Sequence, residues 1–145
     1  MRAITLLILC VVLTTGALAA PTTLPTTNPS RTVLDGVYSP EQLARGEKAY
    51  LGLCARCHGE NLLGNDDAPA LVDKDFLDHW YDKPLGKLVD LTWKKMPTDG
   101  PGRMNRKQST DITTYLLSQN GYPAGTDDLP PDPAGLNSLL IKAKP

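Results

Sequence analysis

Apolar side chains recur every three or four residues in three segments of the chain, which is the spacing of one face of an α-helix. These segments cover residues 40–54, 84–95 and 105–120. A short helical turn is expected at 75–81. No segment shows the alternation of apolar and polar residues that is typical of a strand. The pattern therefore predicts an all-α protein.

Two of the expected helices begin at sequences that typically cap a helix. Ser39 is a plausible N-cap because Pro40 follows it at the first helical position, and Gln42 then completes a capping-box pattern. Asn105 and Gln108 have the same spacing at the start of the last long helix. Both helices are therefore expected to begin with reciprocal hydrogen bonds between a side chain and the backbone.

Gly46 lies inside the first expected helix, where glycine costs about 1 kcal/mol relative to alanine. Close approach of a second helix would explain why a residue without a side chain occurs there. The alternative is that the segment is simply a weak helix.

The amino-terminal residues resemble a targeting segment rather than part of a fold. Arg2 precedes an apolar run at 4–14, which is too short to span a bilayer comfortably, and Ala-Leu-Ala at 17–19 is a typical cleavage site. We expect a signal peptide over 1–19 and a Pro/Thr-rich linker over 20–37. The alternative is an uncleaved membrane anchor.

Length and composition leave room for one small domain. The chain has 145 residues, a formal charge of −1, three cysteines and two histidines. This near-neutral composition gives no support for nucleic-acid binding. Modest apolar content with many Pro and Gly residues predicts a marginal core, which a buried cofactor would complete. We expect the domain at 38–122, followed by a Pro-rich extension at 123–145 that packs on it.

The sequence Cys54-Ala55-Arg56-Cys57-His58 has the spacing of a c-type haem attachment site. Two thiols two residues apart can bond covalently to a haem, and the histidine that follows can ligate its iron. In other settings this spacing marks a redox pair or half of a zinc site. A zinc site needs a second pair of ligands, which the chain hardly offers. We therefore expect one covalently attached haem c.

The second axial position of the iron decides the function, and the residues alone leave several candidates. Met96 precedes a proline at the start of a loop over 97–102, which would free its thioether to reach a haem. Met104, near the last helix, is more typical of core packing. His79 lies in an acidic turn and is expected at the surface. The position could also stay open.

With these motifs the chain resembles class I cytochrome c, specifically the small bacterial cytochromes with one haem. The motif at 54–59 and the Met96-Pro97 loop carry the resemblance. Gly46 and Tyr50 are similar to a pair on the family's first helix that packs against an aromatic residue of the last helix, here Tyr115. The resemblance implies three to five helices wrapped around one covalently attached haem.

The resemblance also implies roles for residues around the haem. His58 and Met96 would be the two axial ligands. Pro69 is similar to the loop proline whose carbonyl accepts a hydrogen bond from the ligating imidazole. Phe76 and Trp80 are similar to positions along the haem edge, although they could equally be ordinary core aromatics.

The function implied is electron transfer without catalysis. We expect a periplasmic bacterial monomer that has no small-molecule substrate. Its donor would be a dehydrogenase, for example a quinoprotein, and its acceptor an oxidase or another cytochrome. The alternatives are a haem sensor or peroxidase-like protein with an open or displaceable sixth position, and a subunit anchored in a membrane complex.

Charges are distributed unevenly along the sequence. Five basic residues flank the methionine loop, with only Asp99 among them, whereas seven acidic residues lie at 60–82. This distribution suggests the hypothesis that the basic side steers the protein toward an acidic partner. The basic residues are Lys94, Lys95, Arg103, Arg106 and Lys107.

Overall fold

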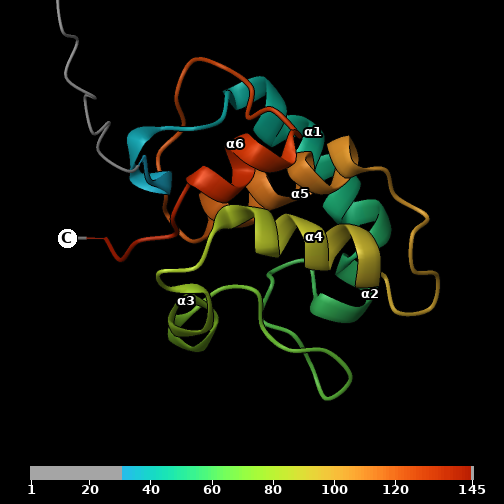
Figure 1. Cartoon of the computed structure of the whole chain (residues 1–145). Coiled ribbons are helices and arrows are strands. Elements are labelled where there is room, and N and C mark those ends of the chain that lie inside the picture. Colours follow the sequence, from blue (N-terminus) through green and yellow to red (C-terminus); the bar gives the residue numbers. More distant parts are fainter. Residues whose placement is uncertain (1–30, 145) are drawn as a thin grey trace, which may run out of the picture.

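The computed structural model describes residues 31–144, and these form only helices and connecting segments (Figure 1). The expected all-α class is confirmed, while the predicted signal peptide and most of the predicted linker lie outside the described residues. One 3-10 helix and six α-helices occur in this part of the chain: η1 (Val33–Asp35), α1 (Pro40–Leu53), α2 (Ala55–His58), α3 (Lys74–Trp80), α4 (Leu85–Lys95), α5 (Arg106–Gln119) and α6 (Pro133–Ser138).

Six helices exceed the three to five that were expected, and two short ones account for the difference. The haem-attachment motif itself forms the single turn of α2. The Pro-rich extension forms α6, which starts at Pro133 behind the capping residue Asp132. Proline at the first helical position is favourable because no hydrogen bond to its nitrogen is needed there.

The cap predicted for α5 is confirmed, whereas only half of the cap predicted for α1 is. Asn105 and Gln108 form the full capping box of α5. At α1, the Ser39 hydroxyl accepts the predicted bond from the backbone nitrogen of Gln42, at 3.0 Å. The Gln42 side chain does not return to the cap. It bonds instead to Asp111 and to both backbone groups of Leu129.

That use of Gln42 reflects its burial between α1, α5 and the carboxy-terminal extension. The side chain is 2% exposed, so each of its polar atoms needs a partner inside the protein. The carboxylate of Asp111 also forms ion pairs with Arg45 at 3.4 Å and Lys107 at 3.0 Å. A buried polar network therefore fixes α1 against α5.

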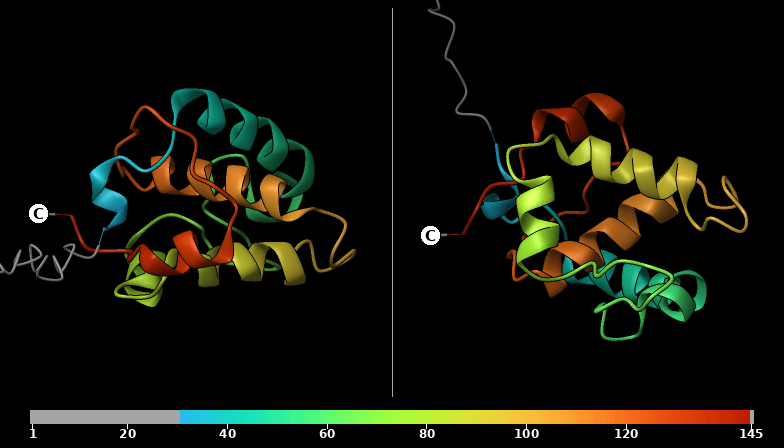
Figure 2. Two further views of the ribbon diagram at one scale, coloured as in Figure 1. Left: turned by 45° about the horizontal axis from the view of Figure 1, so that its top comes forward. Right: turned by 90° about the horizontal axis from the view of Figure 1, so that it is seen from below.

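Helices α1 and α5 lie against each other (Figure 2). Gly46 lies at their contact, as the sequence suggested. A Cβ atom at Gly46 would lie 1.9 Å from the backbone oxygen of Asp111, so only glycine allows this approach. One turn further along α1, the rings of Tyr50 and Tyr115 pack with their centroids 5.1 Å apart. The predicted first-helix pair and its aromatic partner are confirmed as a packing unit.

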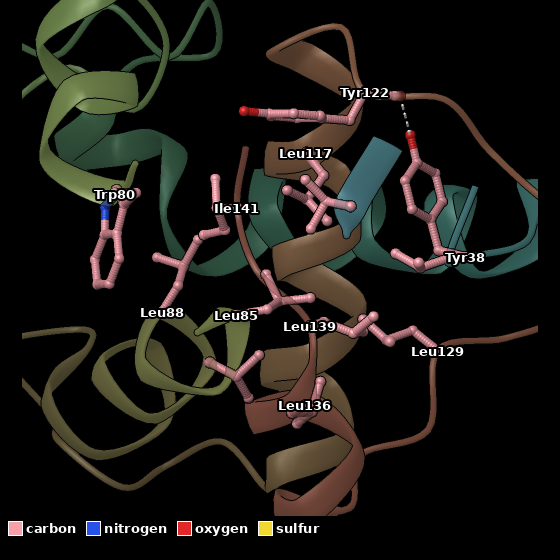
Figure 3. Packing of buried hydrophobic residues seen from close by; sticks show 13 residues of the cluster. Tyr38, Trp80, Leu85, Leu88, Leu117, Tyr122, Leu129, Leu136, Leu139 and Ile141 are labelled. Carbon is pink, nitrogen blue, oxygen red and sulfur yellow. Dashed lines mark hydrogen bonds between the residues drawn. The ribbon is translucent and has the colours of Figure 1, made fainter. Parts of the chain in front are cut away.

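The carboxy-terminal extension contributes to the main core. Leu136, Leu139 and Ile141 are buried in one cluster with residues of α4 and α5 (Figure 3). The hydroxyl of Tyr38 donates a hydrogen bond to the backbone oxygen of Tyr122, which joins the start of the described chain to the start of the extension. Helix α6 lies against α4 (Figure 2). The extension thus completes the hydrophobic core.

Candidate haem-binding site

A large cavity of about 740 Å³ lies beside a second hydrophobic cluster, which consists of Tyr50, Leu62, Met104, Ile112, Tyr115 and Leu116. Its volume falls within the range of roughly 300–1,000 Å³ that is typical of cofactor and ligand sites. Most of its lining is apolar and comes from every helix between α1 and α5. Cys54, Cys57, His58 and Met96 all line it. The structure therefore brings the two thiols and both predicted axial ligands to one cavity.

His58 is held by a contact that also fixes the proton on its ring. Its Nδ1 lies 2.8 Å from the backbone oxygen of Pro69, which is the contact expected from the resemblance. A carbonyl can only accept, so Nδ1 carries the proton and the lone pair is on Nε2. The ring is 8% exposed and lines the cavity. Its arrangement is that of a metal-ligating histidine with an outer partner.

The two cysteines line the same cavity from the end of α1 and from α2. Both are free, with no disulfide between them. Burial, and then the neighbouring Cys57, raise the pKa of the Cys54 thiol to about 11. Cys54 is therefore a neutral thiol at neutral pH and suits an apolar environment.

Among the candidates for the sixth ligand, the structure separates the two methionines. Helix α4 ends at Lys95, so Met96 leaves the helix with an extended backbone and contributes to the cavity. Met104 is 2% exposed and packs in the second cluster with Tyr50, Leu62 and Ile112. It is core, as its position near the helix suggested. Of the two, only Met96 contributes to the cavity lining.

His79 and Trp80 lie at the end of α3. His79 is exposed, as expected, but it also lines the cavity. The imidazole and indole rings meet edge to face at 5.1 Å. Trp80 is buried and lines the cavity together with Phe76. These two aromatics are therefore both core residues and cavity residues, so the two interpretations made from sequence do not exclude each other.

Sequence reasoning missed most of the apolar lining. Two helices contribute residues that were counted only as core or not considered: Leu88, Leu91, Thr92, Ile112 and Leu116. Their helical spacing predicted a buried face but could not show that part of this face meets a cavity. Among the described residues, the cavity lining also includes four aspartates and no lysine or arginine. The aspartates are Asp67, Asp73, Asp75 and Asp99.

The site residues fit a haem. The donors are an imidazole nitrogen and a thioether sulfur, which are the axial ligands of cytochromes c, together with two thiols that can form covalent links. The apolar lining suits a large hydrophobic macrocycle. Within residues 31–144, no helix is long and apolar enough to cross a membrane.

Comparisons with known proteins agree with this chemistry. A family model described as "Cytochrome C oxidase, cbb3-type, subunit III" matches residues 41–116. The subunit CcoP of a cbb3-type cytochrome c oxidase from Rubrivivax gelatinosus is 28% identical over 85 residues, which are 58% of this chain and 28% of that subunit. The chain thus spans little more than a quarter of that relative's length.

Among solved structures, the crystal structure of the sulfane dehydrogenase SoxCD from Paracoccus pantotrophus is similar with a TM-score of 0.46 and 23% identity. The alignment covers 76% of this chain and 61% of that one. The family model, by contrast, spans more than half of the 145 residues and includes the whole haem-attachment motif. The chain therefore belongs to the cytochrome c family of the cbb3-type oxidase subunit III.

Proposed function

We propose that this chain is a monohaem cytochrome c with His58 and Met96 as axial ligands and with Cys54 and Cys57 as covalent attachment points. Membership of the family makes it a haem protein of electron transfer, which is a carrier and not by itself an enzyme. One observation supports the finer assignment above all others. The imidazole, the thioether and both thiols line one largely apolar cavity.

The proposed roles of the residues follow from their chemistry. Haem supplies a one-electron couple between ferrous and ferric iron when it is bound. The Pro69 carbonyl fixes the ring of His58 and makes its Nε2 a better donor. A thioether at the other position raises the reduction potential relative to a second imidazole. With both positions taken by the protein, oxygen and peroxide have no place to bind.

Optical spectra of the purified protein test this assignment. We expect low-spin ferric and ferrous spectra, no response to carbon monoxide, and the weak red band of a methionine bound to ferric iron. Met96→Ala should lose that band because it removes the sulfur ligand. A high-spin protein that responds to carbon monoxide would instead indicate an open site, as in a haem sensor.

Met104→Ala is the matched control, since it removes the other methionine of the described residues. We expect it to keep the red band and to lose about 2–5 kcal/mol of stability, because it leaves a cavity in the second cluster. Loss of the band in Met104→Ala and its retention in Met96→Ala would instead identify Met104 as the axial ligand.

The proposed setting is the bacterial periplasm, where haem c is attached after export. We propose a signal peptide at 1–19, the domain at 38–122 and the extension at 123–145. The linker predicted at 20–37 extends too far, because Val33 and Val37 are buried in the main core. Support comes from the amino-terminal sequence and from the relative CcoP, which is named as an oxidase subunit. A dehydrogenase, including a quinoprotein, would be the donor and an oxidase or another cytochrome the acceptor of this monomer.

The structure does not favour the hypothesis of a basic docking side. Four of the five basic residues near the methionine loop form ion pairs, which they share among Asp90, Asp99 and Asp111. Asp90 pairs with Lys94 and Arg106, each at 2.8 Å. Asp99 lies 4.0 Å from Arg103 and also pairs with Arg56. Lys107 pairs with Asp111 inside the buried network. Lys95 has no ion pair among the described residues.

The acidic segment at 60–82 is the less neutralised side. Only two of its seven carboxylates form ion pairs among the described residues, Asp78 with Lys74 and Asp82 with Lys142. Three of the other five, Asp67, Asp73 and Asp75, line the haem cavity itself. We therefore propose that the redox partner presents a basic surface to this side, which reverses the earlier hypothesis.

Small charged oxidants can measure this field without the natural partner. Oxidation of the ferrous protein by cationic tris(phenanthroline)cobalt(III) should slow with rising salt, whereas oxidation by ferricyanide should accelerate. The double variant Asp67→Asn/Asp75→Asn removes two negative charges. It should therefore lower the ratio of the rate with the cobalt complex to the rate with ferricyanide by roughly two- to fivefold at low salt. Asp127→Asn, an exposed residue that does not line the haem cavity, should leave that ratio nearly unchanged. Opposite salt dependences would restore the hypothesis of a basic docking side.

A further inference from the structure

The loop between α2 and α3 carries the carbonyl that holds His58, and it is anchored at both ends. At its start, the Tyr50 hydroxyl donates to the backbone oxygen of Gly59 at 2.7 Å. At its end, Nδ2 of Asn120 donates to the backbone oxygen of Leu71 at 2.9 Å. Apart from His58, no other side chain from outside residues 59–71 hydrogen-bonds to this loop in the described part of the chain.

Asn120 is the C-cap of α5 and is 6% exposed. Its Nδ2 is shared between the backbone oxygens of Leu71 and Leu116, at 2.9 and 2.8 Å. Both partners can only accept, so the orientation of the amide is fixed. Its Oδ1 is buried and has no hydrogen-bond partner within residues 31–144, which costs free energy. Both hydrogen bonds of the Asn120 side chain therefore come from Nδ2, and together they join the end of α5 to the loop.

Backbone hydrogen bonds within the loop, and from the loop to His58, couple the position of Leu71 to that of Pro69. The backbone nitrogen of Leu71 donates to the oxygen of Leu62 at 2.8 Å, and that of Gly64 donates to the oxygen of His58 at 2.9 Å. Gly64 also packs directly on Pro69, since a Cβ atom there would lie 2.6 Å from the Pro69 carbonyl carbon. Pro69 therefore packs against Gly64. It also lies two residues before Leu71, which Asn120 holds in place.

We propose that Asn120 is a positioning residue for the proximal histidine. By holding Leu71, it keeps the Pro69 carbonyl in place and so keeps the hydrogen bond to Nδ1 of His58 intact. This inference rests on the proposed function, in which His58 ligates the iron. Asn120 itself touches neither the iron nor the imidazole, so its effect passes through the loop.

The test compares two Asn→Leu variants at opposite ends of α5 in the haem-loaded protein. Asn120→Leu keeps the approximate volume and removes the donor to Leu71. Asn105→Leu removes the N-cap of the same helix, far along it from the loop. The readouts are solvent exchange of the His58 Nδ1 proton, followed by NMR of the ferrous protein, and the midpoint reduction potential.

In Asn120→Leu the Nδ1 proton should exchange about tenfold faster, since a loosened loop opens its hydrogen bond more often. The potential should rise, because an imidazole with a weaker hydrogen bond donates less to ferric iron. Asn105→Leu should lower the melting temperature and leave both readouts unchanged. If Asn120→Leu does not yield folded protein, Asn120→Ser, which is too short to reach both carbonyls, should shift both readouts in the same directions.

Unchanged exchange and potential in a folded Asn120 variant would overturn the assignment of Asn120. Equal changes in Asn105→Leu would do the same, because they would trace the effect to general loss of stability. A wild-type protein without low-spin, histidine-ligated haem would overturn the proposed function itself. The spectrum of the wild type therefore separates the two failures.

Discussion

A chain truncated after Tyr122 is expected to lose its cooperative fold and to yield no stable haem protein. The truncation removes four buried side chains of the main core, Leu129, Leu136, Leu139 and Ile141. Complete burial of one such side chain contributes about 1.5–3 kcal/mol. Together they amount to the same order as the whole stability of a small domain, about 5–15 kcal/mol.

Losses beyond the apolar contacts add to this effect. Gln42 would keep its buried amide but lose both of its bonds to Leu129. Denaturant titration of the haem-loaded full chain and of the truncated chain measures the difference. A chain ending at Lys142, which keeps every buried residue of the extension, is the control and should unfold like the full chain. A cooperative transition of normal midpoint in the shorter chain would show that the fold does not need residues 123–145.

Gly46→Ala is expected to destabilise the protein by about 2–3 kcal/mol, although alanine is the better helix former. The added methyl group would meet the backbone oxygen of Asp111. A backbone atom of a helix cannot move away as the end of a flexible side chain could. Helices α1 and α5 would have to separate. That movement would disturb the tilted packing of the Tyr50 and Tyr115 rings and the hydrogen bonds of Asp111.

The same substitution on the same helix offers a matched control. A Cβ atom at Gly52 would meet nothing within 4 Å. Gly52→Ala should therefore stabilise the protein by up to about 1 kcal/mol through helix propensity alone. Chemical denaturation of both variants gives the two free energies of unfolding. Equal signs would contradict the close approach of the helices at Gly46.

Much of the candidate site could be predicted because it rests on local spacing. Two thiols and an imidazole within five consecutive residues must lie close together in any fold. The residue before a proline disfavours helical backbone angles, so Pro97 favours a helix end near Met96. The glycine at position 46 could likewise be interpreted from the sequence, since glycine destabilises a helix and close approach of another element explains its presence there. These features need no knowledge of distant contacts.

Two side chains, Gln42 and Arg106, bind residues that lie far from them in the sequence, and sequence reasoning missed these contacts. Gln42 has the right spacing for a capping box. Its amide is buried against Asp111 and Leu129, however, and it hydrogen-bonds to these residues instead of to the cap. Three of the basic residues near the methionine loop pair with an aspartate four positions away, so these ion pairs are local: Lys94 with Asp90, Arg103 with Asp99 and Lys107 with Asp111. Arg106 pairs with Asp90 from a different helix, a contact that no local spacing predicts.

The sequence by itself therefore determined the all-α class, the haem-attachment motif and the glycine at the helix crossing, because each depends on residues a few positions apart. The tertiary structure alone decided which methionine lines the cavity, which charges remain unpaired around it, and how the extension completes the core. It also joined Asn120 to the loop of Pro69 across 49 positions. Such contacts depend on how helices pack, and no local pattern encodes them.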